Sequence, residues 1–359
     1  MIKMKYKVVV CGVSNYNGLK TAVLRKHFDY SGYIGKVLLK PNLTTAAGPE
    51  SAIITHPGFV KAVRNLFSSK NVMVADSPGY FVGNEKKRFF AITGYDKIKD
   101  VKLNLIDELD MKKDSILAKG KYKLVLPELK WTFLVNIPKL KLHPLTGFTA
   151  GVKNLMGLIP GYQKKMLHNV FNTREKFSRM LLGLYTKFNP QLTVVDAVEC
   201  LQGTPVSGTK KNCGLIIAGN DALAVDTVIG HISNIHSPVL EYARKSGYEA
   251  ATIENIELIY ENISKNVSIK LSSKEKNSWL AKLMQGDKRI FNHVYPKIDK
   301  KKCIDCGKCA KECINQAMHS KVNKNKCFKC FHCISVCPKG AIRRNLDFNP
   351  LFRLYKRIK

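Results

Sequence analysis

The sequence lacks any long apolar run and any recognisable targeting segment. No stretch approaches the 18 or more apolar residues that a membrane-spanning helix needs. The basic start of the chain is followed by an apolar run, Val8 to Val13 broken at Gly12, that is shorter than the core of a secretory signal. We therefore expect a cytoplasmic protein, with peripheral attachment at the membrane surface as the alternative.

Several motifs that would define a cofactor or a reaction are also missing. The chain contains no Walker A sequence, no G-x-G-x-x-G, no H-E-x-x-H and no nucleophile elbow. These absences argue against nicotinamide binding in the usual way and against zinc-peptidase chemistry.

Acidic residues are scarce. The 359 residues include 60 Lys or Arg but 27 Asp or Glu, which gives a formal net charge of +33. Such a balance favours anionic partners such as nucleic acid, anionic lipid, an acidic redox protein or a phosphorylated substrate. The alternative is a set of solvated basic faces, because the lysines are scattered along the whole chain. Nucleic acid is the weaker expectation, since basic and aromatic residues do not interleave and no nucleic-acid motif is present.

Cysteine, in contrast, is concentrated. Eight of the eleven cysteines lie in the 35 residues from Cys303 to Cys337. The spacing C-x2-C-x2-C-x3-C occurs twice, 24 residues apart, and the second run is followed by Pro338. Three sulfurs in one tight loop reach three corners of an iron–sulfur cube, and the fourth ligates the other cube. The predicted ligands are Cys303, Cys306, Cys309 and Cys337 for one cluster, and Cys327, Cys330, Cys333 and Cys313 for the second.

This spacing resembles the bacterial two-cluster ferredoxin, and the resemblance covers about 50 residues. It implies two [4Fe–4S] clusters as cofactors; two four-cysteine zinc sites are the alternative. The sequence departs from the family at Ile314, where proline usually follows the fourth cysteine. Disulfides are not expected in a chain without a secretory signal. We interpret the three isolated cysteines, Cys11, Cys200 and Cys213, as buried thiols.

The cysteine region is unusually basic for such a domain. Residues 300–359 hold 16 Lys or Arg and three Asp or Glu. Positive charge near a cluster stabilises its reduced form and should raise its potential. It should also attract an acidic redox partner, such as a ferredoxin, a flavodoxin or an enzyme subunit.

The rest of the chain alternates apolar strand-like and helix-like segments up to about residue 265. This alternation predicts an α/β fold with a mostly parallel sheet and flanking helices, followed by a small α+β ferredoxin-like domain. The chain ends in a basic tail, which either touches a membrane or partner, or packs back on the protein. The expected divisions are an α/β domain at 1–265, a connector at 266–294, the iron–sulfur domain at 295–345 and a basic amphipathic tail at 346–359.

Short motifs in the α/β region resemble the domain-of-unknown-function family 362 across about residues 8 to 235. Members of this family often carry an appended ferredoxin domain, and the family implies no reaction. The motifs are Lys40-Pro41-Asn42-Leu43, Thr55-His56-Pro57, Asp76-Ser77-Pro78-Gly79, Asn136 to His143, Gly151 to Gly157, Val195-Asp196-Ala197 and Ala224-Val225-Asp226.

Polar residues in these motifs follow apolar strands, which places them at the carboxyl edge of a parallel sheet, where α/β proteins bind ligands. Cations, amides, carboxylates and imidazoles gathered there suit an anionic substrate with proton transfer nearby. Each also has a structural alternative, because Asp caps turns and a lone His is often structural. The catalytic candidates are Lys40, His56, His143, Lys153 and His168. The candidates for binding a ligand or second cofactor are Asn42, Asp76, Lys141, Asn154 and Asp196.

A shorter stretch is similar to nickel-pincer lactate racemases. His143, Lys153 and His168 occur in that family's order with Gly147 and Pro160-Gly161 between them, but the Gly-Gly pair before the lysine is missing. The resemblance implies Lys153 as a cofactor anchor, His168 as a ligand and His143 in proton transfer. Nickel is not among the predicted cofactors.

Three functions follow from these features. The first is an oxidoreductase in which the clusters exchange electrons with an anionic substrate or second cofactor at the sheet edge. The second is a dedicated electron carrier or assembly subunit whose large domain docks on a partner enzyme. The third is a basic nucleic-acid-binding protein with structural clusters.

Overall fold

The computed structural model describes residues 6–16, 21–79, 86–119, 122–129, 132–203, 208–272, 295–313, 316–327 and 332–345. The predicted tail at 346–359 and most of the predicted connector lie outside these residues. The chain divides into two compact units. The first comprises Met1–Leu117, Lys123–Gly161 and Phe171–Glu275, and the second comprises Ala118–Tyr122, Tyr162–Val170 and Lys276–Lys359.

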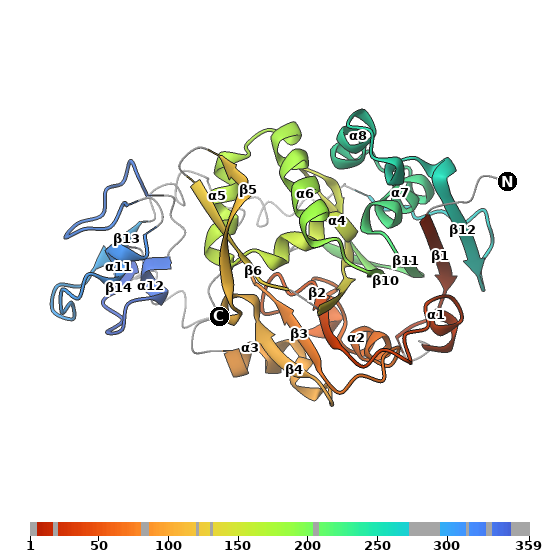
Figure 1. Cartoon of the computed structure of the whole chain (residues 1–359), viewed down its shortest axis with the longest axis horizontal. Helices are drawn as coiled ribbons and strands as arrows, with labels where there is room; N and C mark the ends of the chain where they lie inside the picture. The colour runs from red at the N-terminus through yellow and green to blue at the C-terminus, as the bar shows by residue number, and fades with distance from the viewer. Residues whose placement is uncertain are drawn as a thin grey trace. The chain divides into compact units, whose positions relative to one another are not determined.

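A ten-stranded mixed sheet forms the centre of the first unit (Figure 1). Eight of its strands lie side by side, and β8 (Lys139–His143) and β9 (Gly147–Thr149) extend it beside β10. The eight strands, in spatial order, are β12 (Ile256–Glu261), β1 (Tyr6–Gly12), β11 (Thr209–Gly219), β10 (Leu192–Gln202), β7 (Thr132–Ile137), β2 (Lys36–Pro41), β3 (Val72–Asp76) and β4 (Lys102–Leu105).

Most strand pairs of this sheet are parallel. From β10 through β7, β2 and β3 to β4, every neighbour runs in the same direction, and β12 is parallel to β1. The exception is β11, which is antiparallel to both β1 and β10, and the small β9 is antiparallel to β8. The prediction of an α/β fold with a mostly parallel sheet is therefore confirmed. A separate two-stranded sheet joins β5 (Met111–Lys119) and β6 (Tyr122–Pro127).

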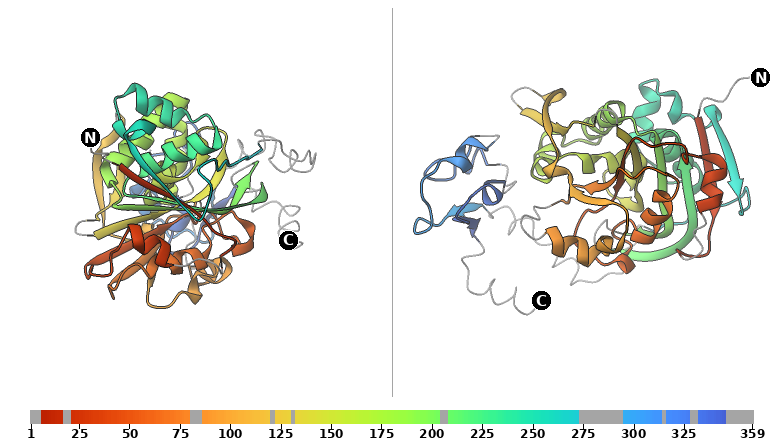
Figure 2. Two further views of the ribbon diagram at one scale, coloured as in Figure 1. Left: turned by 90° about the vertical axis from the view of Figure 1, so that its right-hand side faces the viewer. Right: turned by 60° about the horizontal axis from the view of Figure 1, so that its bottom comes forward.

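Helices cover both faces of the sheet. In both views α2 and α3 lie on one face, whereas α4, α6 and α7 lie on the other (Figures 1 and 2). Side chains that precede a helix often set its first turn: Asp221 accepts hydrogen bonds from two backbone N–H groups at the start of α7, and Ser237 caps α8. The helices are α1 (Thr21–His27), α2 (Pro57–Arg64), α3 (Lys86–Thr93), α4 (Gly151–Asn154), α5 (Gly161–Val170), α6 (Arg174–Phe188), α7 (Ala222–Ser233) and α8 (Pro238–Lys245).

The core between the sheet and helices α1 to α3 is apolar and fully buried. Leu39, Val74 and Val135 on neighbouring strands pack with Phe59 of α2 and Phe89 of α3. These strands alternate between the two covered faces, which explains why their sequences are almost continuously apolar. The polar residues that follow the strands are thereby held at a rigid edge.

The second unit is small and built on a short antiparallel pair. Its elements are β13 (Pro296–Ile298), α11 (Lys308–Lys311), α12 (His332–Ser335) and β14 (Ile342–Arg344). Ile298 of β13 lies opposite Ile342 of β14, and a minimal core contains Met318, Cys333 and Ile342. This is the predicted small α+β domain. Across the described parts of both units, no helix has the length and apolar character needed to span a bilayer.

Candidate functional site

Where both cysteine runs are described, several backbone features recur at the 24-residue offset. Each begins after an Asx turn: the Asp299 carboxylate accepts from the N–H of Lys301, and the Asn323 side chain accepts from the N–H of Asn325. The backbone N–H of Asp299 donates to the carbonyl of Ala341 (2.7 Å), as that of Asn323 donates to the carbonyl of Ala317 (2.8 Å). The repeat seen in the sequence is therefore a structural repeat.

Each run also ends in the same way. The backbone N–H of Ala317 donates to the Cys313 sulfur, and that of Ala341 donates to the Cys337 sulfur, both at 3.2 Å. The preceding residue has positive φ in both runs, at Gln316 (50°) and Gly340 (56°). An N–H that points at a sulfur stabilises its thiolate form, which is the form that ligates metal.

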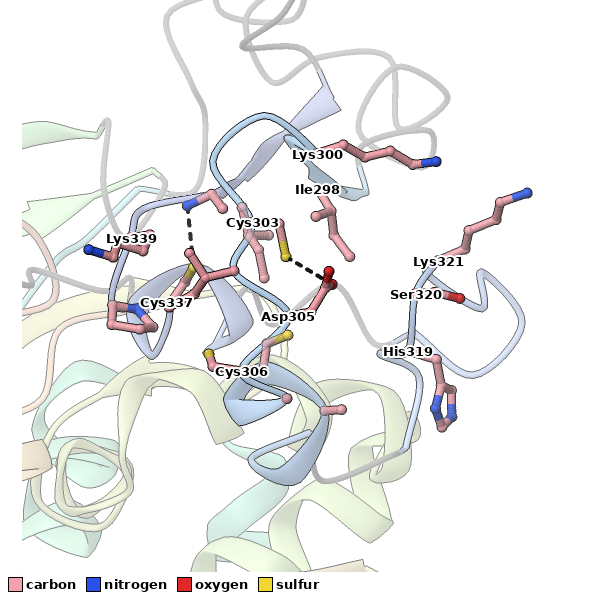
Figure 3. A pocket seen from close by; sticks show the side chains of 17 residues that line it. Ile298, Lys300, Cys303, Asp305, Cys306, His319, Ser320, Lys321, Cys337 and Lys339 are labelled. Carbon is pink, nitrogen blue, oxygen red and sulfur yellow. Dashed lines mark hydrogen bonds between the residues drawn. The ribbon is translucent and has the colours of Figure 1, made fainter.

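Three thiols of the first run and one of the second line a cavity (Figure 3). It measures about 740 Å³ and its lining includes Cys303, Cys306, Cys309 and Cys337. Ile298, Ala310 and Ile342 supply apolar wall beside the thiols. A cavity with four soft sulfur donors, one of them contributed by the other run, fits a [4Fe–4S] cluster.

In the first unit, the carboxyl ends of β2 and β3 are joined by a buried ion pair. The Lys40 ammonium lies 2.9 Å from the Asp76 carboxylate and 2.9 Å from the carbonyl of Pro41. The other carboxylate oxygen of Asp76 accepts from the backbone N–H of Leu43. Burial lowers the pKa of Lys40, and the charge of Asp76 opposes that shift. The pair fixes the loop that leaves β2.

Glycine is required beside this pair. A Cβ atom at Gly157 would collide with the Asp76 carboxylate and the Lys40 ammonium. The carbonyl of Gly157 also accepts from the backbone N–H of Ser77, at 3.0 Å. The short 3-10 turn Leu155–Leu158 thus closes over the ion pair and excludes water from it.

A second buried network joins the amides of Asn42 and Asn154 to Lys141. The Asn42 side chain donates to Asn154 (3.1 Å) and accepts from the Lys141 ammonium (2.8 Å). Lys141 also donates to the carbonyl of Ile53 (2.9 Å) and to the Thr44 hydroxyl (3.4 Å). All these partners are neutral oxygens. Burial first, and then the charges of Lys153 and Lys139, lower the pKa of Lys141 to about 7.

A third group lies where β8 meets β10. The Lys139 ammonium lies 3.1 Å from the Asp196 carboxylate and donates to the Tyr16 hydroxyl at 2.6 Å. Tyr16 stacks on the His56 ring, with centroids 3.9 Å apart, and donates to Asp196. His56 caps α2, because its Nδ1 accepts from the backbone N–H of Gly58. That bond places the proton of the neutral ring on Nε2, and burial lowers the pKa of His56.

These contacts bring most of the predicted residues together. Lys40, Asn42, Asp76, Lys141 and Asn154 form one continuous set of hydrogen bonds and ion pairs, and His56 and Asp196 form another. Each set also contains the capping and loop-positioning contacts that the structural alternative predicted. Ligand binding by these residues stays a prediction.

The three residues of the racemase-like stretch, His143, Lys153 and His168, are more exposed than the buried networks described above. His143, at the end of β8, is partly exposed, and its Nδ1 accepts from the backbone N–H of Leu145 (3.2 Å). The Lys153 ammonium lies 3.3 Å from the Met156 sulfur and over the Phe177 ring. His168 is exposed on α5, in a segment that belongs to the second compact unit. A joint role for the three stays a prediction.

Two functional candidates were not predicted from the sequence. Tyr16 follows a strand in an irregular loop, so no pattern links it to Asp196, 180 residues away. Asp226 lies on α7 and accepts from the backbone N–H groups of Gly151 and Val152, which begin α4. Burial raises the pKa of Asp226 to about 7. Asp226 belongs to the motif Ala224-Val225-Asp226, but its contact with the glycine segment is visible only in the folded structure.

Comparison with known proteins agrees with this division of the chain. Residues 37–231 match the model of a domain of unknown function, DUF362, and residues 296–319 match a 4Fe-4S binding domain. The first match covers more than half of the chain, which therefore belongs to the DUF362 family. The chain also carries a 4Fe-4S binding domain, which lies in its second unit.

Two similar proteins give the range of the likeness. The Thylakoid-associated protein sll1697 of Synechocystis sp. is 30% identical over 211 residues, which are 55% of this chain and 62% of that protein. This chain thus spans less than two thirds of that relative's length. The lactate racemase apoprotein of Thermoanaerobacterium thermosaccharolyticum has 17% identity and a TM-score of 0.43, over 63% of this chain and 57% of that one.

Proposed function

We propose that the protein is an iron–sulfur oxidoreductase with two [4Fe–4S] clusters in its second unit. Its first unit would bind an anionic substrate or second cofactor at the carboxyl edge of the sheet. The observation that carries the proposal is the excess of buried cations at this edge. Lys40, Lys139 and Lys141 are all buried there, and the buried carboxylates that pair with them are Asp76 and Asp196. An anion at the edge would offset the remaining charge.

In the second unit we assign four thiols to each cluster. Cys303, Cys306 and Cys309 with Cys337 would hold the first, and Cys327, Cys330 and Cys333 with Cys313 would hold the second. Each bound cluster supplies one-electron transfer. The chain contributes thiolates, the Ala317 and Ala341 N–H groups that stabilise them, and the apolar wall around the first cavity.

Iron analysis of protein purified without oxygen tests the cofactor assignment. Two clusters require about eight iron atoms and eight sulfide ions per chain. Stoichiometric zinc, or about four irons per chain, would overturn the two-cluster assignment.

In the first unit the residues divide by exposure into supporting and contacting groups. Lys40 and Asp76 are buried in their pair, and Asn42 and Asn154 orient Lys141. Partly exposed side chains, Lys153, His56 and His143, would contact the ligand and move protons. His56 suits proton transfer because its lowered pKa favours the neutral ring, with the proton on Nε2.

Anion binding is testable without knowing the substrate. Inorganic phosphate and oxalate, as probes, should raise the Tm of the full-length protein by mass action. Lys153→Met should abolish that rise, whereas Lys70→Met, at an exposed lysine, should preserve it. An equal rise in both variants would place any anion elsewhere and overturn this site.

One observation favours the dedicated electron carrier as a second candidate. Within the described residues, every buried side-chain nitrogen and oxygen already has a hydrogen-bond partner. A carrier needs no unsatisfied polar group at the sheet edge. Electron transfer to a partner protein that is unaffected by Lys153→Met and His143→Gln would favour the carrier.

An acidic redox partner is part of both candidates. Lys300, Lys321 and Lys339 line the rim of the first cavity (Figure 3). If they dock an acidic protein, the rate of electron transfer should fall as salt rises, and Lys321→Glu should slow it. Lys70→Glu, at an exposed lysine of the first unit, is the matched control. A rate that is independent of salt would argue for a neutral partner.

A further inference from the structure

Two of the cysteines outside the iron–sulfur motif lie on adjacent antiparallel strands. Cys200 is on β10 and Cys213 is on β11. The pairing register shifts between them: Ala197 lies opposite Leu215, whereas Glu199 lies opposite Asn212. Val198 therefore faces two residues, Cys213 and Gly214, in a β-bulge.

The bulge changes the direction of the Cys213 side chain. Gly214 has φ +62°, and a Cβ there would approach the carbonyl of Val13 at 2.9 Å. A glycine with positive φ beside the extra residue is the usual geometry of such a bulge, and bulges often re-aim a side chain next to a functional site. Here the re-aimed side chain is a thiol.

The two thiols influence each other's ionisation and differ in exposure. The Cys200 thiol donates to the carbonyl of Ala197 (3.7 Å), and the Cys213 thiol donates to the carbonyl of Lys211 (3.8 Å). Cys200 is fully buried, whereas Cys213 is partly exposed. The interpretation of Cys213 as a buried thiol was therefore wrong, because the first half of β11 is not buried. This half still pairs with β10 but is more exposed than the second half, and Lys210 and Asn212 near Cys213 are exposed.

The surroundings of the pair favour one thiolate. The neighbouring Cys200 thiol, followed by the charges of Lys211 and Lys139, lowers the pKa of Cys213. Burial raises the pKa of Cys200. The accessible thiol is thus the more acidic one, and the buried thiol holds its proton. Reactive dithiols divide the roles of attacking and resolving thiol in this way.

We propose that Cys200 and Cys213 form a reversible dithiol–disulfide couple that exchanges with a disulfide-bearing substrate. The couple would be a second redox site, in the α/β unit, and it does not depend on the proposed sheet-edge function. It carries two electrons, whereas each iron–sulfur cluster carries one.

The exchange balances without another reactant. The Cys213 thiolate attacks one sulfur of the substrate disulfide, and the substrate's other sulfur leaves as a thiolate. Cys200 then loses its proton and attacks the Cys213 sulfur, which releases the second substrate thiolate. Two protons convert the leaving groups to thiols, so the substrate gains two electrons and the protein gains one disulfide. A dithiol can run both steps in reverse: it reduces the Cys200–Cys213 disulfide and is itself oxidised to a disulfide.

Redox titration of the full-length, cluster-loaded protein tests the proposal. The protein is equilibrated without oxygen in mixtures of reduced and oxidised dithiothreitol, quenched with N-ethylmaleimide, digested with trypsin and analysed by mass spectrometry. Trypsin cuts after Lys210 and Lys211, so the two cysteines fall in different peptides. A Cys200–Cys213 disulfide appears as a pair of linked peptides. The ratio of linked to unlinked peptides should change tenfold for each change of about 30 mV in the potential of the dithiothreitol mixture.

Variants separate the two roles. Cys213→Ser should abolish the linked pair, and Cys200→Ser should trap a mixed disulfide on Cys213 when glutathione disulfide is added. Cys11→Ser, at a buried thiol on β1, should leave the couple unchanged. If the linked pair never forms in any mixture, the proposal is overturned. This test needs only the unmodified chain, so it does not depend on whether the variants fold. The linked peptide pair is measured separately from the iron–sulfur clusters, whose loss is seen as loss of visible absorbance. Failure of the disulfide proposal and failure of the proposed iron–sulfur function therefore give different results.

Discussion

The two units of this protein assemble their candidate sites by opposite means. In the second unit, most of the hydrogen bonds that shape a cysteine run join residues a few positions apart, as in Ala341 N–H to Cys337, and the bond from Asp299 N–H to the Ala341 carbonyl is the long-range exception among those described. In the first unit, Lys40 reaches Asp76 across 36 residues, and Asn42 reaches Asn154 across 112. The first unit therefore depends on its sheet for function, whereas the second depends on its local turns.

Burial separates the units just as clearly. The ammonium groups of Lys40, Lys139 and Lys141 are almost completely shielded from water. Cys306, in contrast, is exposed, and Cys303 is partly exposed. Damage to the first unit should therefore appear as lost stability, and damage to the second as lost cofactor.

The largest effect is expected at the crossed cluster ligands. Cys337→Ser should perturb the same cluster as Cys303→Ser, although Cys337 lies in the other run, because Cys337 and Cys303 line one cavity. Cys313→Ser should match Cys327→Ser instead. Electron paramagnetic resonance of the dithionite-reduced variants, together with iron content, distinguishes the two clusters.

Cys11→Ser is the control for general thiol loss and should keep all the iron. If Cys337→Ser and Cys327→Ser gave the same spectrum, with Cys303→Ser different, each run would hold its own cluster. That outcome would remove the crossed arrangement.

The next largest effect is expected at the buried ion pair. Lys40→Met leaves the Asp76 carboxylate without its cation and should lower the free energy of unfolding by about 3–5 kcal/mol. Lys26→Met breaks the exposed pair with Glu261, which should cost far less because water screens that pair. Urea denaturation, followed by a signal from the first unit, measures both. Equal losses in the two variants would show that burial does not govern the Lys40 pair.

The sequence predicted the location of this pair but not its contacts. Lys40 and Asp76 each follow an apolar run, so their place at the sheet edge follows from strand direction alone. Lys139 and Lys141 stand two residues apart in one motif, yet they bind different partners, Asp196 and Asn42. That choice depends on β8, which pairs with β10, and register between distant strands leaves no mark in a single sequence.

The cysteine runs were more predictable because their geometry is local. Spacing of two and three residues fixes which sulfurs share a loop, and the repeat is visible without a fold. The antiparallel β11 was not predicted, because an apolar strand has the same composition in either direction. The bulge at Cys213 was missed for the same reason: it is a property of two paired strands.

A smaller loss of stability is expected at Gly157. The Cβ of Gly157→Ala would force the Lys40 and Asp76 side chains apart, at a cost of about 1–3 kcal/mol. Gly48→Ala is the matched control, since its Cβ would meet no atom within 4 Å and its φ of −65° suits alanine. Thermal denaturation of both variants gives the comparison. Wild-type stability of Gly157→Ala would mean that the turn moves freely away from the ion pair.

The smallest effect is a change of slope with pH, due to Lys141. Its pKa is about 7 in the folded protein and near 10.5 in an unfolded chain. Between these values the unfolded chain binds more protons than the folded protein. Loss of the Lys141 proton therefore makes folding more favourable as pH rises above 7. Below about pH 6 both states are protonated and this contribution is flat.

The difference in unfolding free energy between the natural chain and Lys141→Met isolates this contribution. It should be nearly constant below about pH 6, begin to rise as pH approaches 7, and then rise by up to about 1.4 kcal/mol per pH unit toward pH 9. Lys141→Arg keeps a cation that does not titrate in this range, so its difference from Lys141→Met should stay flat throughout. A flat curve for the natural chain as well would mean that Lys141 stays charged. Its three neutral oxygen partners would then suffice to hold a buried ammonium group without an anion.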